Sequence, residues 1–292
     1  MFKNFYVYDY GTANNADLVS ALANQEPFYP CLATAFSSAG WSELNENGDY
    51  SLVVGDGILM AFRQLYKVVP LLLVKKRLAE AVLACYQNTG RMPGKKERRD
   101  LRDDVITGLL PDIIPREKLH YVWFGNAGRL IVEASSSSDA DKIITAIARQ
   151  APDSKFFVKG LHTEKSLVAA ATAWLLENDD SETIGNELSL GYNLKLQDSN
   201  SAKSTVTVSN VAIRKNEQVQ QFLREGYLVK NIELGWQLNN YVTVTDNLSF
   251  KRLSVDMPEE QDDSSPATLK SEAFAYVRTI DAMVSSLVEA LK

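Results

Sequence analysis

The sequence predicts an α+β fold, and three patterns support this class. Segments that alternate apolar and polar residues, as strands do, occur in groups rather than evenly between helices. A hairpin–helix–strand order occurs twice, over residues 120–158 and again over residues 187–234, without any residue-level repeat. A long helical segment precedes the first of these stretches. Grouped strands with helices over one face are typical of the α+β class.

The first third of the chain is expected to begin with strands. Residues 5–8 alternate as a strand, and residues 16–24 predict a short helix. Two apolar runs, 51–54 and 58–62, flank a Gly-Asp-Gly sequence at 55–57. Asp-Gly between apolar runs is a strong hairpin signal, so these runs are predicted to pair around a tight turn.

Two helices follow, and both carry end signals. After Pro70, apolar residues recur at helical spacing, at positions 71, 74, 78, 82 and 85, and Gly90 ends the pattern. A Pro-Gly turn at 93–94 precedes a second helix, which runs from Lys95 to about Leu110 and is closed by the proline that follows.

The rest of the chain alternates hairpins with helices. We expect strands at 120–124 and 129–134, a helix at 139–151, a strand at 156–158, paired strands at 187–196 and 204–211, a helix at 217–225, a strand at 230–234 and a last hairpin joining 241–244 to 248–253. We predict a discontinuous central α+β domain, a helical basic arm, a second α+β domain, an acidic linker and a C-terminal amphipathic helix. Their expected bounds are 1–62 with 119–175, then 63–118, 176–256, 257–268 and 269–292.

The terminal helix carries a regular apolar seam. Its apolar residues alternate by three and four in an a/d pattern: Val277, Ile280, Val284, Leu287 and Leu291. Such a seam can pack on the helix's own domain or against a second chain, and the pattern leaves both open.

Composition narrows the function classes. The 292 residues are 45 % apolar and carry a formal net charge of −6, so the chain can bury a core and is not a globally basic protein. Two cysteines, Cys31 and Cys85, do not make a disulfide framework, which favours a reducing, cytoplasmic compartment. No run of about 20 apolar residues predicts a membrane span. The N-terminus resembles a strand rather than a signal peptide.

The charge is unevenly distributed along the chain. Between Arg63 and Lys118 there are thirteen basic and seven acidic residues, so this segment carries +6 and the remainder carries −12. In the second helix, at about 100° per residue, Lys95, Arg98, Arg99 and Arg102 fall within one arc. The acidic residues of the same helix, at 97, 100, 103 and 104, are assigned to the opposite side. A segregated basic face is typical of a surface that binds a polyanion, although a solvated helical face gives the same pattern.

Several kinds of chemistry are not supported. The stretch from Gly90 to Lys96 is one residue short of a phosphate-binding loop and follows a helix instead of a strand. His120 and His162 are far apart in sequence and suggest neither a metal site nor a catalytic triad. No spacing of acidic residues predicts a nuclease site. The four tryptophans, at 41, 123, 174 and 236, lie in apolar contexts that favour core packing over base stacking. We therefore expect no enzyme and no cofactor.

Many short motifs resemble the bacterial recombination-associated RdgC family, in the same order along nearly the whole chain. They are Phe2-Lys3-Asn4, Phe28-Tyr29-Pro30-Cys31, Gly40-Trp41, Val69-Pro70, the basic stretch 93–105, Leu109-Leu110-Pro111, Trp123, Ala173-Trp174-Leu175, Leu234-Gly235-Trp236, the segment 248–253 and the terminal helix ending at 287–291. The resemblance implies a non-enzymatic, nucleoid-associated protein that binds double-stranded DNA with little sequence preference. It also implies horseshoe-shaped subunits that close into a ring-shaped homodimer around DNA and limit access of the RecA recombinase.

The resemblance and the charge pattern together indicate a set of DNA-binding residues. These are Lys75, Lys76, Arg77, Arg91, Lys95, Lys96, Arg98, Arg99, Arg102, Arg116, Lys118 and Lys230. Tyr227 stands where relatives carry a lysine after the glycine matching Gly226, so Lys230 is the substitute there. Arg116-Glu117-Lys118 occupies the expected tip of the horseshoe, which allows a salt-bridged contact between subunits. Two alternatives remain: a protein-interaction module that acts on a recombinase or replication protein, and a divalent-metal nuclease.

Overall fold

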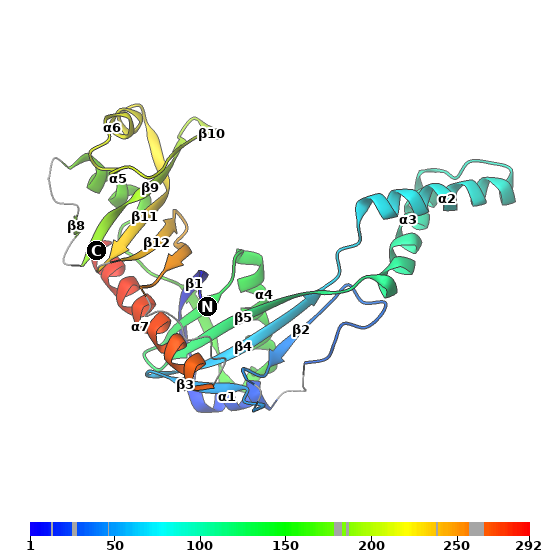
Figure 1. Cartoon of the computed structure of the whole chain (residues 1–292), viewed down its shortest axis with the longest axis horizontal. Helices are drawn as coiled ribbons and strands as arrows, with labels where there is room; N and C mark the ends of the chain where they lie inside the picture. Colours follow the sequence, from blue (N-terminus) through cyan, green and yellow to red (C-terminus); the bar gives the residue numbers. More distant parts are fainter. Residues whose placement is uncertain are drawn as a thin grey trace. The chain divides into compact units, whose positions relative to one another are not determined.

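The structure is a computed structural model that describes residues 1–12, 14–24, 28–45, 47–177, 183–184, 187–237, 239–256 and 266–292. Figure 1 shows its elements. Among the described residues there are seven α-helices and a large antiparallel sheet, so the predicted mixture of α and β structure is confirmed. The chain divides into two compact units. Unit 1 comprises Met1–Gln25, Glu43–Ala61 and His120–Lys292, and unit 2 comprises Glu26–Ser42 and Phe62–Leu119.

Unit 1 contains most of the strands. They are β1 (Asn4–Gly11), β3 (Ser51–Val54), β6 (Arg129–Glu133), β7 (Phe157–Gly160), β8 (Thr183–Ile184), β9 (Leu188–Asp198), β10 (Ser201–Val208), β11 (Tyr227–Trp236), β12 (Asn240–Thr245) and β13 (Ser249–Ser254). Its helices are α1 (Asn15–Ala23), α4 (Ser137–Gln150), α5 (Leu167–Leu176), α6 (Glu217–Arg224) and α7 (Pro266–Ala290), with a 3-10 turn at Pro152–Ser154. Strands β4 (Gly57–Tyr66) and β5 (Arg116–Gly125) contribute residues to both units.

The strand order in unit 1 brings together strands that lie far apart in the sequence. Neighbouring strands follow the order β10-β9-β11-β12-β13-β1-β6. Strand β1 therefore lies between β13, where Phe5 pairs with Phe250, and β6, where Tyr6 pairs with Val132. The phenyl rings of Phe5 and Phe250 stack with centroids 4.8 Å apart. The N-terminal strand is thus held by a strand near residue 250.

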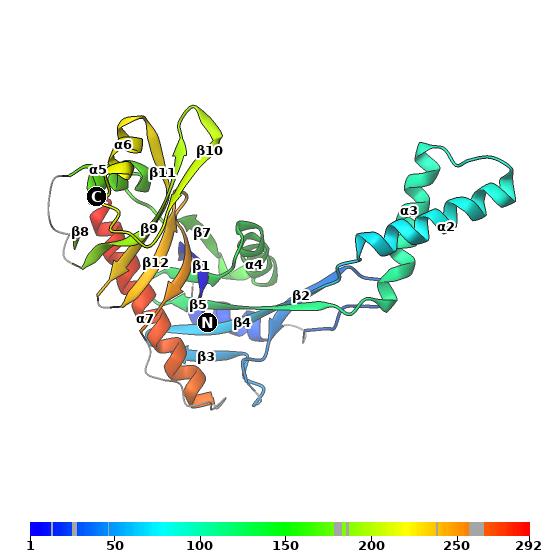
Figure 2. The same cartoon turned by 45° about the horizontal axis from the view of Figure 1, so that its top comes forward.

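Helix α7 covers the apolar face of this sheet, as Figures 1 and 2 show. The residues of its a/d seam are between 0 and 4 % exposed: Val277, Ile280, Val284, Leu287 and Leu291. They belong to the same core as the inward residues of β9, β11 and β12. The seam therefore packs on the helix's own unit. Of the two interpretations of the a/d pattern, the structure supports packing within the chain rather than against a second chain.

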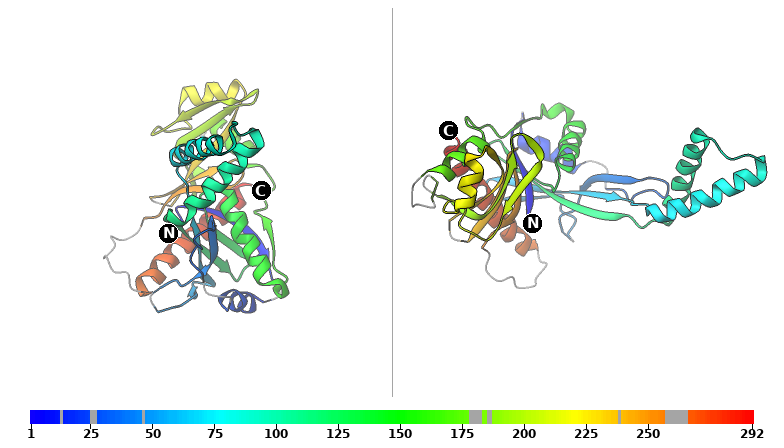
Figure 3. Two further views of the ribbon diagram at one scale, coloured as in Figure 1. Left: turned by 90° about the vertical axis from the view of Figure 1, so that its right-hand side faces the viewer. Right: turned by 90° about the horizontal axis from the view of Figure 1, so that it is seen from above.

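Unit 2 is built around a pair of helices, α2 (Leu71–Thr89) and α3 (Lys95–Leu109) (Figure 3). It also contains β2 (Ser37–Ser42) and a 3-10 turn at Leu110–Asp112. Trp41 and Phe62, both 2 % exposed, meet edge to face with ring centroids 5.2 Å apart. The other three tryptophans are buried in unit 1, with at most 8 % exposure, so the core interpretation of all four is confirmed.

Most predicted elements are present with shifted ends, but helix α5 and the strands β2 and β8 were not predicted. Helix α5 was not predicted because its residues are apolar almost throughout and show no helical period. Strand β2, with the sequence SSAGWS, has no β-branched residue to mark it. The predicted linker 257–268 falls mostly on 257–265, outside the described residues, and α7 begins at Pro266. The two predicted α+β domains fall mainly in unit 1, but residues 26–42 of the first belong to unit 2. The separation of the two domains stays a prediction.

Candidate nucleic-acid interface

Helix α2 is bounded by the residues that the sequence analysis identified. Pro70 precedes it with φ −62° and ψ 125°, and Gly90 ends it with φ +69°, in the left-handed region that glycine tolerates. The predicted cations Lys75, Lys76 and Arg77 are all exposed on this helix. Because consecutive helical residues point about 100° apart, these three face different sides. They cannot contact one ligand surface together, and the Arg77 guanidinium also pairs with the Glu80 carboxylate at 3.2 Å.

Arg91 is occupied within the connection between α2 and α3. Its guanidinium donates two hydrogen bonds to the Glu97 carboxylate, at 2.9 and 2.6 Å. The same carboxylate accepts the backbone N–H of Gly94 at 2.8 Å and thereby caps the start of α3. These bonds lower the pKa of Glu97 to about 2, the bond from Arg91 being the larger cause. Arg91 therefore organises the turn and is not a free contact for an anion.

Helix α3 carries the densest group of available cations. Lys95, Lys96, Arg98, Arg99 and Arg102 are all exposed, and none forms an ion pair with a residue that the structure describes. The half-buried Leu101 and Val105 and the buried Leu109 lie along the apolar side of the helix. The side chains at 98 and 102 lie beside this apolar side, one turn apart, so they present their charge together.

The separation of charges on α3 is less complete than predicted. Glu97, Asp100 and Asp104 lie away from the basic arc, but Asp103 does not. At about 100° per residue, Asp103 falls roughly 40° from Arg99, one turn later on the same side. The prediction that all four carboxylates oppose the basic arc is therefore wrong for Asp103. This carboxylate offsets part of the charge near Arg99, while the Arg98 side of the arc has no such neighbour.

The basic residues on strands β4 and β5 of unit 2 differ in whether they have a partner. Arg116 is exposed and forms no ion pair with a described residue, whereas the Lys118 ammonium lies 5.4 Å from the ring centroid of Tyr66. Arg63 pairs with Glu117 at 3.2 Å within the unit.

Lys67 is buried, although it counts toward the basic segment. It is 9 % exposed, and its ammonium donates to the carbonyls of Leu32, Ala33 and Leu110 at 3.2, 2.6 and 2.9 Å. A charged group held this way cannot also face an external anion. The charge of +6 therefore overstates the positive charge that the segment presents to solvent.

Lys230 does not belong to the same group as the other predicted residues. It lies on β11 in unit 1, whereas the other eleven predicted DNA-binding residues lie in unit 2. Its ammonium is 2.5 Å from the Asp246 carboxylate at the turn between β12 and β13. The structure thus gives Lys230 a partner in its own unit.

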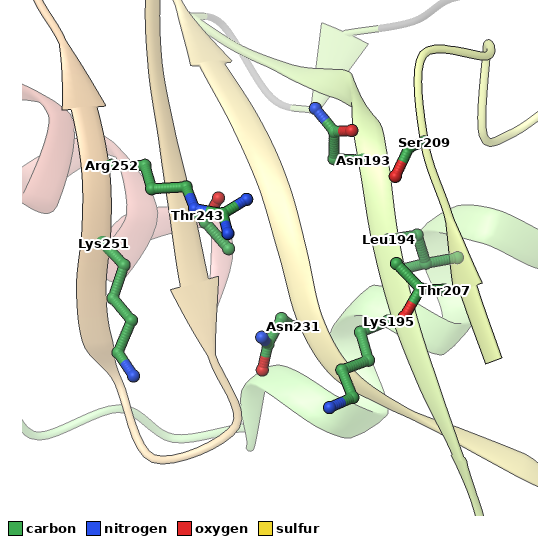
Figure 4. A pocket seen from close by; sticks show the side chains of 9 residues that line it. All are labelled: Asn193, Leu194, Lys195, Thr207, Ser209, Asn231, Thr243, Lys251 and Arg252. Atoms are coloured by element: carbon green, nitrogen blue, oxygen red, sulfur yellow. The ribbon is translucent and has the colours of Figure 1, made fainter. Parts of the chain in front are cut away.

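Sequence reasoning missed a second group of cations, on unit 1. Lys195, Lys251 and Arg252 line a polar hollow on the outer face of the sheet (Figure 4). The one signal in the sequence is the pair of adjacent cations between Phe250 and Leu253. Neighbouring strands supply the rest, and their register is not visible in the sequence.

Two other features bear on function. Within the described ranges, no three or more His, Cys, Asp or Glu side chains gather in a way that could hold a metal ion. A search of the described helices finds none long and apolar enough to cross a membrane.

Comparison with known proteins decides the family. A family model with the description "Putative exonuclease, RdgC" matches residues 1–292. The chain belongs to the RdgC family. Its RdgC relatives include the recombination-associated protein of Herminiimonas arsenicoxydans, 24 % identical, and that of Cupriavidus pinatubonensis, 26 % identical, each alignment covering 99 % of this chain and 97 % of the relative. The RdgC protein of Pasteurella multocida is 23 % identical over 90 % of this chain and 86 % of its own length.

Proposed function

We propose that this RdgC-family chain binds double-stranded DNA without sequence preference, as a homodimer that encloses the duplex. The observation that carries this proposal is the group of five exposed cations on α3, none of which forms an ion pair within the part of the chain that the structure describes. Lysine and arginine contacts to phosphates release condensed counterions and carry no base information. Arg116 and the exposed lysines of α2 add charge to the same unit. The remainder of the chain carries a charge of −12, which disfavours DNA over most of the other surfaces.

In the cell, this activity would limit recombination by occupying duplex that RecA needs. The family resemblance supports this role, as do relatives named as recombination-associated proteins. Enclosure in a closed dimer would lengthen the lifetime of the complex without adding contacts. We assign a binding role and no catalytic step.

Charge reversal on α3 tests the DNA interface. In the variant with Arg98→Glu and Arg102→Glu, affinity for unrelated duplexes should fall equally, and the slope of log affinity against log salt should become shallower by about 2, since two phosphate contacts are lost. Mobility-shift titrations at several salt concentrations measure both quantities. The matched control is Lys165→Glu with Lys270→Glu, which makes the same charge change at two exposed residues of unit 1. Unchanged binding in the α3 variant would remove this helix from the interface.

Oligomeric state and enclosure need their own measurement. Light scattering of the free protein should give twice the chain mass. Complexes on closed circular DNA should survive a salt challenge that releases the protein from linear DNA of the same length, because only the linear ends allow a ring to slide off. A monomer, or equal release from both DNAs, would contradict the enclosing dimer.

A nuclease function is the second candidate, because the matching family model carries the word exonuclease in its description. End-labelled linear duplex incubated with the protein and Mg²⁺ or Mn²⁺ distinguishes the two functions. Intact DNA under conditions of full binding fits the binding role, and progressive shortening would replace it. The protein-interaction alternative rested on the seam of α7, which is buried in the core of unit 1.

A further inference from the structure

A polar hollow of about 380 Å³ lies on the outer face of the unit 1 sheet (Figure 4). Its walls come from β9, β11, β12 and β13 and from residues at the end of β10. The other face of these strands packs into the core that contains α7. The hollow therefore opens away from the apolar core, and its volume is that of a small-molecule site.

Strand register brings the polar groups of the hollow onto one face of the sheet. On β9, Leu194 and Leu196 are buried in the core, and Lys195 between them points to the outer face. Lys195 pairs with Thr207 on one side and with Asn231 on the other. Asn231 in turn pairs with Thr245 on β12, and Thr243, two residues before it on the same strand, pairs with Lys251 on β13.

A bulge in β13 adds a second cation to Lys251. Phe250 and Leu253 are 1 and 6 % exposed and both point into the core, so the two residues between them share the outer face. The pairing with β12 shifts at this point, because Tyr241 faces Ser254 while Thr243 faces Lys251. Arg252 adopts φ +54°, which a residue with a side chain rarely takes. The Asn4 side chain accepts its backbone N–H at 3.3 Å, and the next residue, Leu253, bonds to Lys3.

The three cations lack charged partners. Neither Lys195, Lys251 nor Arg252 forms an ion pair with a described residue. The nearby carboxylates are already engaged: Glu233 accepts from the Asn193 amide and the Tyr192 N–H, both at 2.8 Å, and Asp246 pairs with Lys230. A strained backbone that places unpaired positive charge is a feature of binding sites.

We propose that this hollow binds a phosphate group, held by Lys195, Lys251 and Arg252. An arginine fork and two ammonium groups suit the charge and geometry of phosphate oxygens. Thr207 and Thr243 supply hydroxyl donors, and Asn231 supplies an amide. The phosphate belongs either to a free nucleotide or to a nucleic-acid backbone. The site lies in unit 1 and does not depend on the proposed role of α3.

Pyrophosphate and adenosine monophosphate are the probes for the free source, and a single-stranded oligonucleotide is the probe for the backbone source. Each is titrated into the ¹⁵N-labelled full chain, and backbone amide shifts are followed by NMR. We expect pyrophosphate to shift the amides at 195, 231, 243 and 251–252. If the oligonucleotide shifts the same amides and pyrophosphate displaces it, the source is a backbone. If only the small probes shift them, the source is a free nucleotide.

The variant Lys251→Gln with Arg252→Asn tests the residues, since asparagine tolerates the left-handed backbone at 252. Pyrophosphate affinity should fall at least about tenfold, the loss expected for charged hydrogen bonds.

Lys270→Gln on α7 is the control and should leave affinity unchanged. Thermal unfolding of each variant confirms that the fold is retained, and Lys195→Gln, in a regular strand, repeats the test without touching the bulge. Shifts confined to other residues, or unchanged affinity in folded variants, would overturn the proposal. Pyrophosphate binding is measured in the absence of duplex DNA. Its outcome therefore does not depend on whether α3 binds duplex.

Discussion

The carboxylate of Glu97 shows how one residue can remove a cation from a predicted site. The Glu97 carboxylate binds the Arg91 guanidinium and also caps the start of α3. The positive charge of Arg91 is therefore paired within the turn between the helices. Sequence position alone makes Arg91 equivalent to Arg98, because both lie in the basic segment. Only the contacts separate an arginine that shapes the helix pair from one that can meet DNA.

The pKa of Glu97 reports this contact directly. In the native chain it lies at about 2, below its usual value, because Arg91 and the Gly94 N–H stabilise the ionised form. The contact therefore contributes stability above the pKa of the unfolded chain and loses it as pH falls toward 2.

Arg91→Gln should raise the pKa of Glu97 toward the ordinary glutamate range, near 4.3. A ¹³C NMR titration of the carboxyl from pH 6 to 3 should show little change in the native chain and a clear midpoint in the variant. Arg77→Gln, which breaks a separate exposed pair, should leave Glu97 unaffected. An unchanged Glu97 titration in Arg91→Gln would contradict the contact.

At the scale of elements, unit 2 is stabilised by a cation in its interior. Lys67 joins the segment around Leu32 and Ala33 to the end of α3 at Leu110 through three carbonyl groups. The segment at 32–33 has no strand or helix of its own. The carbonyls of Leu32 and Leu110 also accept the backbone N–H groups of Ala35 and Ile113, at 3.0 and 3.2 Å, so the Lys67 ammonium adds a second, charged donor to both. The end of α3 is thus held by a residue outside the helix pair.

Lys67→Met should destabilise unit 2 by about 2–4 kcal/mol, because it removes three hydrogen bonds from a charged donor while preserving most of the side-chain volume. Urea unfolding followed by hydrogen exchange of α2 and α3 amides measures the loss within this unit. Lys76→Met, at an exposed helix position, is the matched control and should change stability little. Equal stability of the two variants would show that the three hydrogen bonds of Lys67 do not stabilise unit 2.

At the scale of the whole molecule, local signals in the sequence predicted most elements but not their partners. The hairpin at 51–62 was found because Gly55, with φ +63°, sits in a recognisable turn. Helix α5 was missed because an almost uniformly apolar segment has no period. The basic face of α3 could be predicted from the helical spacing of its cations. The group of Lys195, Lys251 and Arg252 could not, because it depends on how β9, β11, β12 and β13 pair and on the bulge in β13. The burial of Lys67 has no local signal at all.

The terminal helix provides a prediction for the molecule as a whole. Ile280 is fully buried in the core that joins α7 to the sheet. Ile280→Asp should therefore lower the free energy of unfolding by about 4 kcal/mol or more, through burial of an unpaired charge. Urea unfolding followed by tryptophan fluorescence measures it, and Arg278→Gln on the exposed side is the control. A folded variant that loses only its dimer would instead place this seam between chains.

The position of β1 between β13 and β6 has a consequence for synthesis on the ribosome. Phe5 is translated about 245 residues before its partner Phe250, an interval of roughly 12 to 50 seconds at elongation rates of about 5–20 residues per second. Unit 2 ends at Leu119, so all of its residues have been synthesised long before β13 emerges. On the edge of β1 that β13 later covers, strand β7 can pair with residues 8–11 once residue 160 has been synthesised, but residues 4–6 have no strand to pair with until β13 emerges. A nascent chain that stops before residue 250 leaves this part of the edge open to other strands.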